Sequence, residues 1–365
     1  MNLRWEIDRF MKQLDIFNAT IAHEPHGQFL FYAYFTPDLE RRIREKLQIE
    51  ESINLQDFFG MYNPVEVNLK PLEVLKPKDF SRYFSDIEIP PKAYINGHGV
   101  LNVPGSRYHF TQYISPLRNA TTLKEIEDFP YPSVDGYTDD HMKAAVDKAN
   151  ENNRVTICSL GHMYEDAWQI RGYEAFLMDM IQNPEICEYI LDKITERNLK
   201  RAVAAAKAGV EIIKSGDDVA NQRDLMFSPQ LWRKFMKPRW AKVYKAAREI
   251  KPDIQIWYHS DGNIESIISE LIEIGVTILN PVQPECMDPI AIKKQYGDKI
   301  VIDGTIGTQT TMPFGTVEDV KQVIKDRKEK LGYDGALILS PTHVLEPEVP
   351  IENFLAFVEE CSRKI

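Results

Sequence analysis

Short apolar runs alternate with longer segments of helical length along the last two thirds of this 365-residue chain. A short apolar run bounded by turn residues is typical of a buried strand. Regular alternation of such strands with helices implies a parallel sheet joined by right-handed crossovers. Strands are predicted at 155–160, 210–215, 254–258, 276–279, 300–302 and 336–339.

Several of the helices between these runs have recognisable ends. Ser228-Pro229 shows the cap-then-proline pattern of a helix start, and Gly209 follows the end of a long helix. Earlier in the chain the pattern is less regular. Thr36 begins a short helix there, and 94–116 is predicted as a hairpin. Further helices are predicted at 139–152, 171–182, 185–208, 264–274, 289–296, 317–331 and 351–362.

Six β-α units are clear, and one or two more are expected before residue 120. This number favours a closed (β/α)8 barrel over an open doubly wound sheet, and about 250 residues suffice to build one. An open sheet would usually carry a glycine-rich G-x-G-x-x-G phosphate turn, which this chain lacks. The predicted fold class is therefore α/β, a (β/α)8 TIM barrel over 91–365. Residues 1–90 are expected to form a helical and irregular N-terminal extension packed on it.

The bulk composition excludes several classes of protein. A formal net charge of −11 argues against nucleic-acid binding, which needs a basic surface, and weakly against a highly anionic substrate. No apolar run reaches the length of a membrane helix, so no membrane partner is expected. The four cysteines show no C-x-x-C spacing, and the first residues carry charges, so a cytoplasmic location is expected. Nucleophilic catalysis has little support, because no G-x-S-x-G elbow is present.

The ends of the predicted strands carry the candidate metal ligands, since these ends share one face of a barrel. His259 and Asp261 stand two residues apart after one strand, and in extended geometry both side chains point to the same side. His343, after a later strand, is the natural third ligand. Two histidines and a carboxylate suit Zn²⁺, Fe(II) or another first-row metal. The alternative is a hydrogen-bonded pair with His343 as a polar loop residue.

Other ionisable groups follow the same strands. Asp217 and Asp218 are candidates for a general acid or base or for a substrate anchor, and the alternative is helix N-capping. Asp303 is a third candidate proton handler. Tyr108 and His109, in the predicted hairpin, are expected to close over the cleft. The candidate substrate-binding residues are His162, Tyr258, Asn280 and Gln283.

A set of short motifs runs in order through roughly residues 150–365, and a weaker match lies at Phe35-Thr-Pro-Asp-Leu-Glu40. In order and spacing these motifs resemble the uroporphyrinogen decarboxylase superfamily, which implies a (β/α)8 barrel. The motifs are Gly216-Asp-Asp-Val219, Ser228-Pro229 with Lys237-Pro-Arg239, His259-Ser-Asp-Gly-Asn-Ile264, Leu271-Ile-Glu-Ile-Gly-Val276, Ile278-Leu-Asn-Pro-Val-Gln-Pro-Glu285, Met287-Asp-Pro289, Asp303-Gly-Thr with Thr308-Gln309, and Ser340-Pro-Thr-His343 through Val349-Pro-Ile-Glu-Asn353.

The resemblance implies one of two chemistries. Metal-free decarboxylation of uroporphyrinogen goes with an arginine-rich N-terminal motif, which this chain lacks, and with a basic cleft. The other branch contains methyltransferases that work with corrinoid proteins, and several hold zinc through a His-x-Cys pair and a later cysteine. His259 matches the first ligand, Asp261 stands at the first cysteine, and His343 stands near the later one. This harder ligand set would better polarise an oxygen than activate a thiolate.

Three functions follow from these observations. The leading hypothesis is a methyltransferase or demethylase that moves a methyl group between a small methylated compound and a corrinoid on a partner protein, assisted by Zn²⁺ or another divalent metal. The second is a metal-free decarboxylase or lyase on a smaller carboxylated substrate, and the third is a non-catalytic binding protein. A homodimer is compatible with all three.

Overall fold

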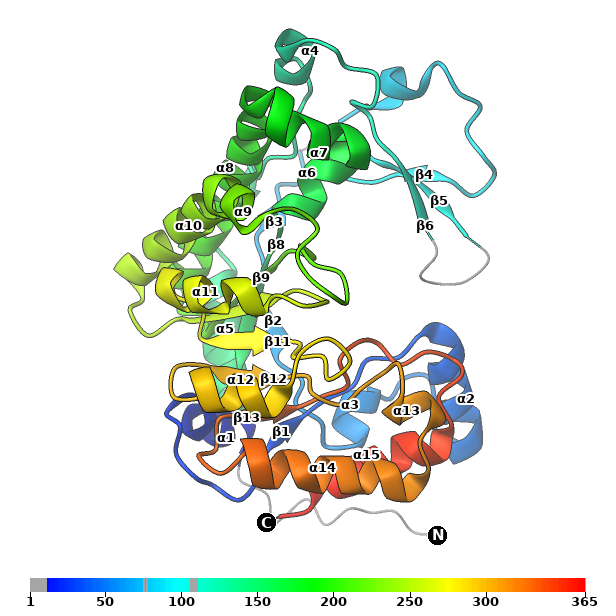
Figure 1. Cartoon of the computed structure of the whole chain (residues 1–365), viewed down its shortest axis with the longest axis vertical. Helices are drawn as coiled ribbons and strands as arrows, with labels where there is room; N and C mark the ends of the chain where they lie inside the picture. Colours follow the sequence, from blue (N-terminus) through cyan, green and yellow to red (C-terminus); the bar gives the residue numbers. More distant parts are fainter. Residues whose placement is uncertain (1–11, 75, 77, 106–110, 365) are drawn as a thin grey trace.

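The computed structural model describes residues 12–74, 76, 78–105 and 111–364. Eight parallel strands form one sheet in the order β1-β13-β12-β11-β10-β9-β8-β2 (Figure 1). The Tyr62 N–H donates to the Phe31 carbonyl at 2.7 Å, which links the two outermost strands of the curled sheet. The predicted TIM-barrel class is confirmed. The strands are β1 (Leu30–Phe31), β2 (Val65–Glu66), β8 (Thr156–His162), β9 (Ile212–Gly216), β10 (Gln255–His259), β11 (Ile278–Asn280), β12 (Val301–Asp303) and β13 (Leu337–Leu339).

The barrel begins earlier in the chain than expected. β1 and β2 lie within the first 90 residues, so residue 90 is not the boundary between an extension and the barrel. Each of these strands is only two residues long, too short to stand out as an apolar run. They are the two additional strands expected before residue 120.

An insertion between β2 and β8 carries small antiparallel sheets. β3 (Lys70–Pro71) pairs with β7 (Tyr137–Thr138), and β4 (Tyr94–Ile95), β5 (Leu101–Pro104) and β6 (Thr111–Ile114) form a second sheet. β5 and β6 confirm the predicted hairpin, whereas Tyr108 and His109 lie outside the described residues. Figure 1 shows this sheet beside α6 and α7, and the Tyr113 and Trp168 rings meet there at 5.8 Å.

The helices follow the predicted alternation, but some are divided or added, such as α13 (Thr311–Phe314). The segment from residue 164 to 182 forms two helices, because Gly172 adopts a φ of 105° between them. The Ser228 hydroxyl accepts from the Leu231 N–H and so caps α9 as expected. Among the helices described, none has the length and apolarity to cross a bilayer. They are α1 (Gln13–Ile21), α2 (Pro37–Leu47), α3 (Leu55–Phe58), α4 (Leu123–Glu127), α5 (Met142–Glu151), α6 (Tyr164–Arg171), α7 (Tyr173–Gln182), α8 (Pro184–Ala208), α9 (Pro229–Phe235), α10 (Lys237–Ile250), α11 (Ile268–Ile274), α12 (Pro289–Tyr296), α13 (Thr311–Phe314), α14 (Val317–Leu331) and α15 (Ile351–Ser362), with 3-10 turns at η2 (Ser81–Phe84) and η3 (Glu265–Ile267).

Successive side chains of each strand alternate between the barrel interior and the helical layer. Ile212, Trp257 and Ile278 belong to the interior cluster, and Ile213 and Tyr258 pack in the outer one. Each fully buried apolar side chain contributes about 1.5–3 kcal/mol, so this alternation sets the register of every strand. A polar residue at a strand end therefore points into the mouth of the barrel when it lies an even number of positions from an interior residue of the same strand.

Candidate active site in the barrel mouth

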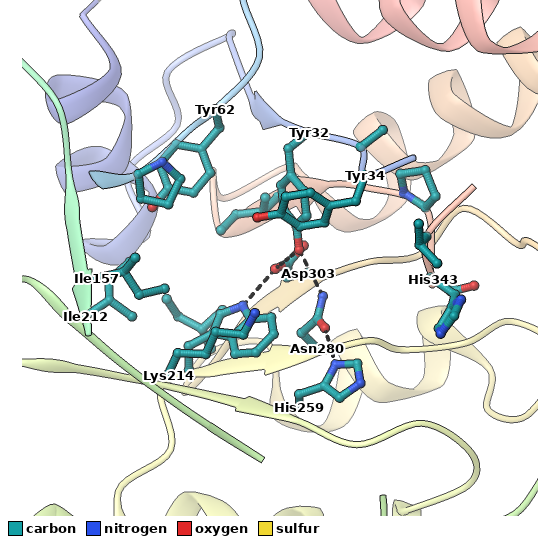
Figure 2. A pocket seen from close by; sticks show the side chains of 18 residues that line it. Tyr32, Tyr34, Tyr62, Ile157, Ile212, Lys214, His259, Asn280, Asp303 and His343 are labelled. Carbon is teal, nitrogen blue, oxygen red and sulfur yellow. Dashed lines mark hydrogen bonds between the residues drawn. The ribbon is translucent and has the colours of Figure 1, made fainter. Parts of the chain in front are cut away.

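The mouth of the barrel contains a cavity of about 190 Å³ (Figure 2). Isoleucines of the strands form its floor, and aromatic rings form its walls. Two of the expected site residues, Asn280 and Asp303, line it, as do two of the expected metal ligands, His259 and His343. The lining residues that sequence reasoning missed include Tyr32, Tyr62, Lys214 and Trp257.

Asp303 is a buried anchor for the cavity walls. Its Oδ2 accepts from the Tyr32 hydroxyl and from Trp257 Nε1, both at 2.9 Å, and its Oδ1 accepts from Ser340 Oγ at 2.9 Å. Burial raises the pKa of Asp303, and the hydrogen bonds to its carboxylate oppose that rise. Because its oxygens are already engaged by these donors, the carboxylate is suited to positioning the two aromatic walls rather than to proton transfer.

A chain of hydrogen bonds runs from Asp303 to His259. The Tyr32 hydroxyl donates to Asp303 and accepts from Asn280 Nδ2 at 3.2 Å. Asn280 therefore directs Oδ1 at His259, whose Nδ1 lies 2.8 Å away and must donate. This assignment of amide and tautomer follows from the network, and it leaves the lone pair of His259 Nε2 facing the mouth.

Asp218, His259 and Asp261 form the candidate metal site. One ligand atom of each lies within 4.8 Å of the other two, and His259 Nε2 is 3.6 Å from Asp218 Oδ1. Asp261 Oδ1 is buried with no hydrogen-bond partner among the described residues. Burial raises the pKa of Asp261, the charge of His259 opposes that rise, and the negative charge of Asp218 adds to it. An imidazole nitrogen with two carboxylates fits Zn²⁺ or a similar divalent metal, which would relieve the repulsion.

His343 is not among the three residues whose ligand atoms lie within 4.8 Å of one another, where Asp218 joins His259 and Asp261. The charge of His343 nevertheless acts to lower the pKa of Asp261, so His343 lies near the same carboxylate. Asp218 follows β9, which is hydrogen-bonded directly to β10, whereas β13 lies three strands away from β10. His343 lines the cavity and also an adjoining hollow that includes Asp261 and Gln283. It is therefore placed to meet a ligand in the mouth.

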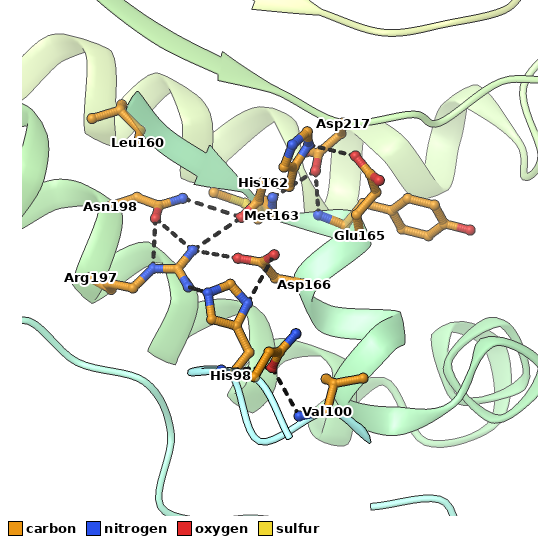
Figure 3. Close-up of polar contacts among 12 residues, drawn as sticks. His98, Val100, Leu160, His162, Met163, Glu165, Asp166, Arg197, Asn198 and Asp217 are labelled. Atoms are coloured by element: carbon orange, nitrogen blue, oxygen red, sulfur yellow. Dashed lines mark hydrogen bonds and ion pairs between the residues drawn. The ribbon is translucent and has the colours of Figure 1, made fainter. Parts of the chain in front are cut away.

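Asp217 does not line the cavity, which argues against its expected catalytic role. It is completely buried, and its Oδ1 accepts from the Met163 and Tyr164 N–H groups at 2.6 Å (Figure 3). Its Oδ2 accepts from Trp240 Nε1 at 2.9 Å. Burial raises the pKa of Asp217 to about 7, against the effect of these donors. Asp217 thus links the start of α6 to α10. It caps α6, which precedes it in the chain, rather than the helix that follows it.

His162 lies beside Asp217 and also outside the cavity lining. Its Nδ1 is 2.5 Å from Glu165 Oε2, and its side chain is 42% exposed (Figure 3). Burial opposes the charge on His162, but the Glu165 carboxylate outweighs it and raises the pKa to about 9. These three residues also cluster closely enough for a metal, yet both oxygens of Asp217 already accept hydrogen bonds. The arrangement fits an ion pair better than a metal site.

Tyr258 and Gln283 complete the expected substrate-binding set. Tyr258 is fully buried in the outer cluster, so its expected contact with a substrate is wrong, and its neighbour Trp257 faces the cavity. Gln283 lines the adjoining hollow, and its Oε1 accepts from the Gly262 N–H at 2.6 Å. That bond holds the backbone next to Asp261. Strand parity could have identified Trp257 and Lys214, because they share the interior parity of His259 and Ile212.

Comparison with known proteins agrees with this architecture. The family model described as uroporphyrinogen decarboxylase (URO-D) matches residues 62–364. A uroporphyrinogen decarboxylase from Rickettsia massiliae is 22% identical over 90% of this chain and 92% of its own. One from Rickettsia akari is 21% identical over 90% and 94%. A methyltransferase from Methanosarcina mazei shares the fold with a TM-score of 0.66 at 17% identity, covering 96% of this chain and 98% of its own. The chain belongs to the uroporphyrinogen decarboxylase family.

Proposed function

We propose that this protein is a methyltransferase that moves a methyl group from a small methylated compound to a corrinoid on a partner protein. The observation that carries the proposal is the position of the Asp218, His259 and Asp261 ligand atoms beside a cavity of about 190 Å³. The likeness in fold to a methyltransferase from Methanosarcina mazei supports it.

The donor set would hold Zn²⁺ or another divalent ion. When bound, that ion supplies Lewis-acid polarisation of the heteroatom that carries the methyl group. Asn280 keeps the His259 imidazole in the tautomer whose Nε2 can bind a metal. The Gln283 bond to the Gly262 N–H fixes the loop that carries Asp261. The aromatic walls hold the methylated compound against these ligands and exclude water.

Metal analysis and a methyl-transfer assay test this proposal together. Wild-type protein should bind one zinc per chain, and His259→Ala should lose it. With cob(I)alamin as acceptor and a panel of methyl ethers, amines and thioethers, the formation of methylcobalamin should depend on His259 and Asp261. Lys245→Met, at a 78% exposed side chain, is the matched control and should leave both readouts unchanged. Unchanged metal content in His259→Ala, or none in either protein, would contradict the metal-assisted mechanism.

The second candidate is a metal-free decarboxylase acting on a small carboxylated substrate. It is favoured by relatives named uroporphyrinogen decarboxylase over nine-tenths of the chain and by Lys214 in the cavity. Uroporphyrinogen itself is far larger than a cavity of about 190 Å³. Release of CO₂ that survives exhaustive chelation and His259→Ala would favour this candidate over methyl transfer.

A further inference from the structure

Lys214 places a positive charge inside the barrel. It lies on β9 directly opposite Trp257 of β10, and its Nζ is 4.6 Å from the centroid of the indole. Its Nζ makes no hydrogen bond and no ion pair with any residue that the structure describes, although the negative charges of Glu66 and Asp303 act to raise its pKa. Asp303, the carboxylate that lines the same cavity, is already held by Tyr32, Trp257 and Ser340. Among the described residues, the ammonium group therefore has a ring contact with Trp257 but no hydrogen-bond acceptor.

The Tyr62 hydroxyl is a second uncommitted donor in the same cavity. Tyr62 is 7% exposed, and its hydroxyl has no hydrogen-bond partner among the described residues. A buried donor left unpaired costs about 1–3 kcal/mol, and a buried cation costs more. Burial also lowers the pKa of Lys214, which an anion beside it would reverse. Figure 2 shows Tyr62 and Lys214 to one side of the cavity and His343 to the other.

The size of the cavity limits the ligand to about one ring. Its volume of about 190 Å³ slightly exceeds the ~150 Å³ of an apolar cavity that holds benzene. Tyr32, Tyr62 and Trp257 offer ring faces and edges, which favour a flat unsaturated ligand. Lys214 is level with Trp257, which lies two residues before His259 on β10. Two residues of a strand correspond to roughly 7 Å along the barrel. A single ring with a substituent at each end spans such a step.

We propose that the ligand of this cavity is a small planar carboxylate, an aromatic acid of one ring. Its carboxylate is bound by Lys214 and Tyr62, and the substituent at its opposite end faces His259. That this substituent carries the transferred methyl group rests on the proposed function, whereas the anion site does not. Methylated ammonium compounds are disfavoured despite the aromatic walls, because Lys214 already occupies a face of Trp257 and repels a second cation.

Calorimetric titration of the full chain with three ligands of matched shape tests this site. These are 4-methoxybenzoate, 4-methoxybenzamide and 4-methoxybenzyl-trimethylammonium. Wild-type protein should bind the acid about tenfold to a hundredfold more tightly than the amide, and the cation least. Lys214→Met should abolish the preference for the acid, Tyr62→Phe should weaken binding of the acid by several-fold, and the surface control Lys245→Met should change nothing.

Equal binding of acid and amide by wild-type protein would overturn the anion site, as would tighter binding of the cation. A Lys214→Met variant that melts normally and keeps the preference would also overturn it. If that variant does not fold, Lys214→Gln replaces it, and the comparison of the three ligands on wild-type protein tests the site independently of either variant. The titrations are repeated on metal-stripped protein without corrinoid. Intact selectivity for the acid there, together with no methyl transfer by the metal-loaded wild-type protein in the cob(I)alamin assay, would reject the proposed function and leave this site standing.

Discussion

His259 Nδ1 lies 2.8 Å from Asn280 Oδ1, and the two residues are direct partners in the register of β10 and β11. The contact joins the candidate metal site to the cavity, because Asn280 also donates to Tyr32 and Tyr32 donates to Asp303. The acceptor on Asn280 fixes which imidazole nitrogen carries the proton. The tautomer of His259 is therefore set by a neighbour across the sheet.

Replacing Asn280 tests this relationship. Asn280→Ala removes the acceptor and frees the imidazole to rotate and change tautomer, so affinity for Zn²⁺ should fall by about tenfold to a hundredfold. Asn280→Asp keeps an acceptor at the same position and should retain most of the affinity. Competition with a chromophoric chelator measures both. Equal affinities of Asn280→Ala and wild-type protein would show that His259 does not depend on this contact.

Asp217 and Asp218 are adjacent in sequence, and their substitutions should have opposite consequences. Asp217→Ala leaves the buried Trp240 Nε1 and two backbone N–H groups without an acceptor, at about 1–3 kcal/mol each. Urea unfolding should show a loss of about 3–5 kcal/mol. Asp218→Asn, at a 37% exposed side chain, should change stability by about 0.5 kcal/mol or less while reducing metal content. A destabilised Asp218→Asn beside a stable Asp217→Ala would reverse these assignments.

Trp257 and Tyr258 form a second adjacent pair with different expected effects. Trp257→Phe removes the indole donor to Asp303 and part of the cavity wall, so binding of 4-methoxybenzoate should weaken by about tenfold. Tyr258→Phe removes a hydroxyl that lies in the outer cluster, away from the cavity, so binding should be unchanged. Calorimetric titration of both variants with 4-methoxybenzoate tests this difference. A loss of affinity in Tyr258→Phe alone would contradict the assignment of Trp257 to the cavity and Tyr258 to the outer cluster.

The ion pair of His162 with Glu165 predicts a pH dependence of stability. The pKa of His162 is raised to about 9 in the folded protein, above the ordinary value of about 6.5 in the unfolded chain. The folded state therefore binds the extra proton, and its stabilising effect is fully present below about pH 6.5 and lost as the pH rises through about 9. Glu165→Gln should lower the pKa of His162 and flatten this dependence. NMR titration of the His162 ring, with unfolding at both pH extremes, checks the prediction.

The barrel could be predicted because its later strands are continuous apolar runs separated by helices. The strands at 155–160, 254–258 and 336–339 correspond to β8, β10 and β13. β1 and β2 could not be placed in this way, because each pairs through only two residues and takes its stability from neighbours far away in the chain. Because these two strands are so short, the predicted boundary between the extension and the barrel was wrongly placed at residue 90.

The candidate site was partly predictable for a related reason. Alternation within a strand places His259 and Trp257 on one face, and the same rule applied consistently excludes Tyr258. The role of Asp217 could not be read in this way, because it follows the last residue of β9, where extended geometry ends. Only the packing of α6 and α10 shows that its carboxylate turns away from the cavity.

By itself the sequence determined the alternation of strands and helices and the polar residues that end each strand, because hydrophobic periodicity is a local property of the chain. The tertiary structure decided which of those residues meet. It brought Asp218 beside His259, since β9 adjoins β10. It also gathered Lys214, Tyr62 and Asp303 around one cavity. Strand order and the direction of loop side chains arise from packing between distant segments, which no local pattern contains.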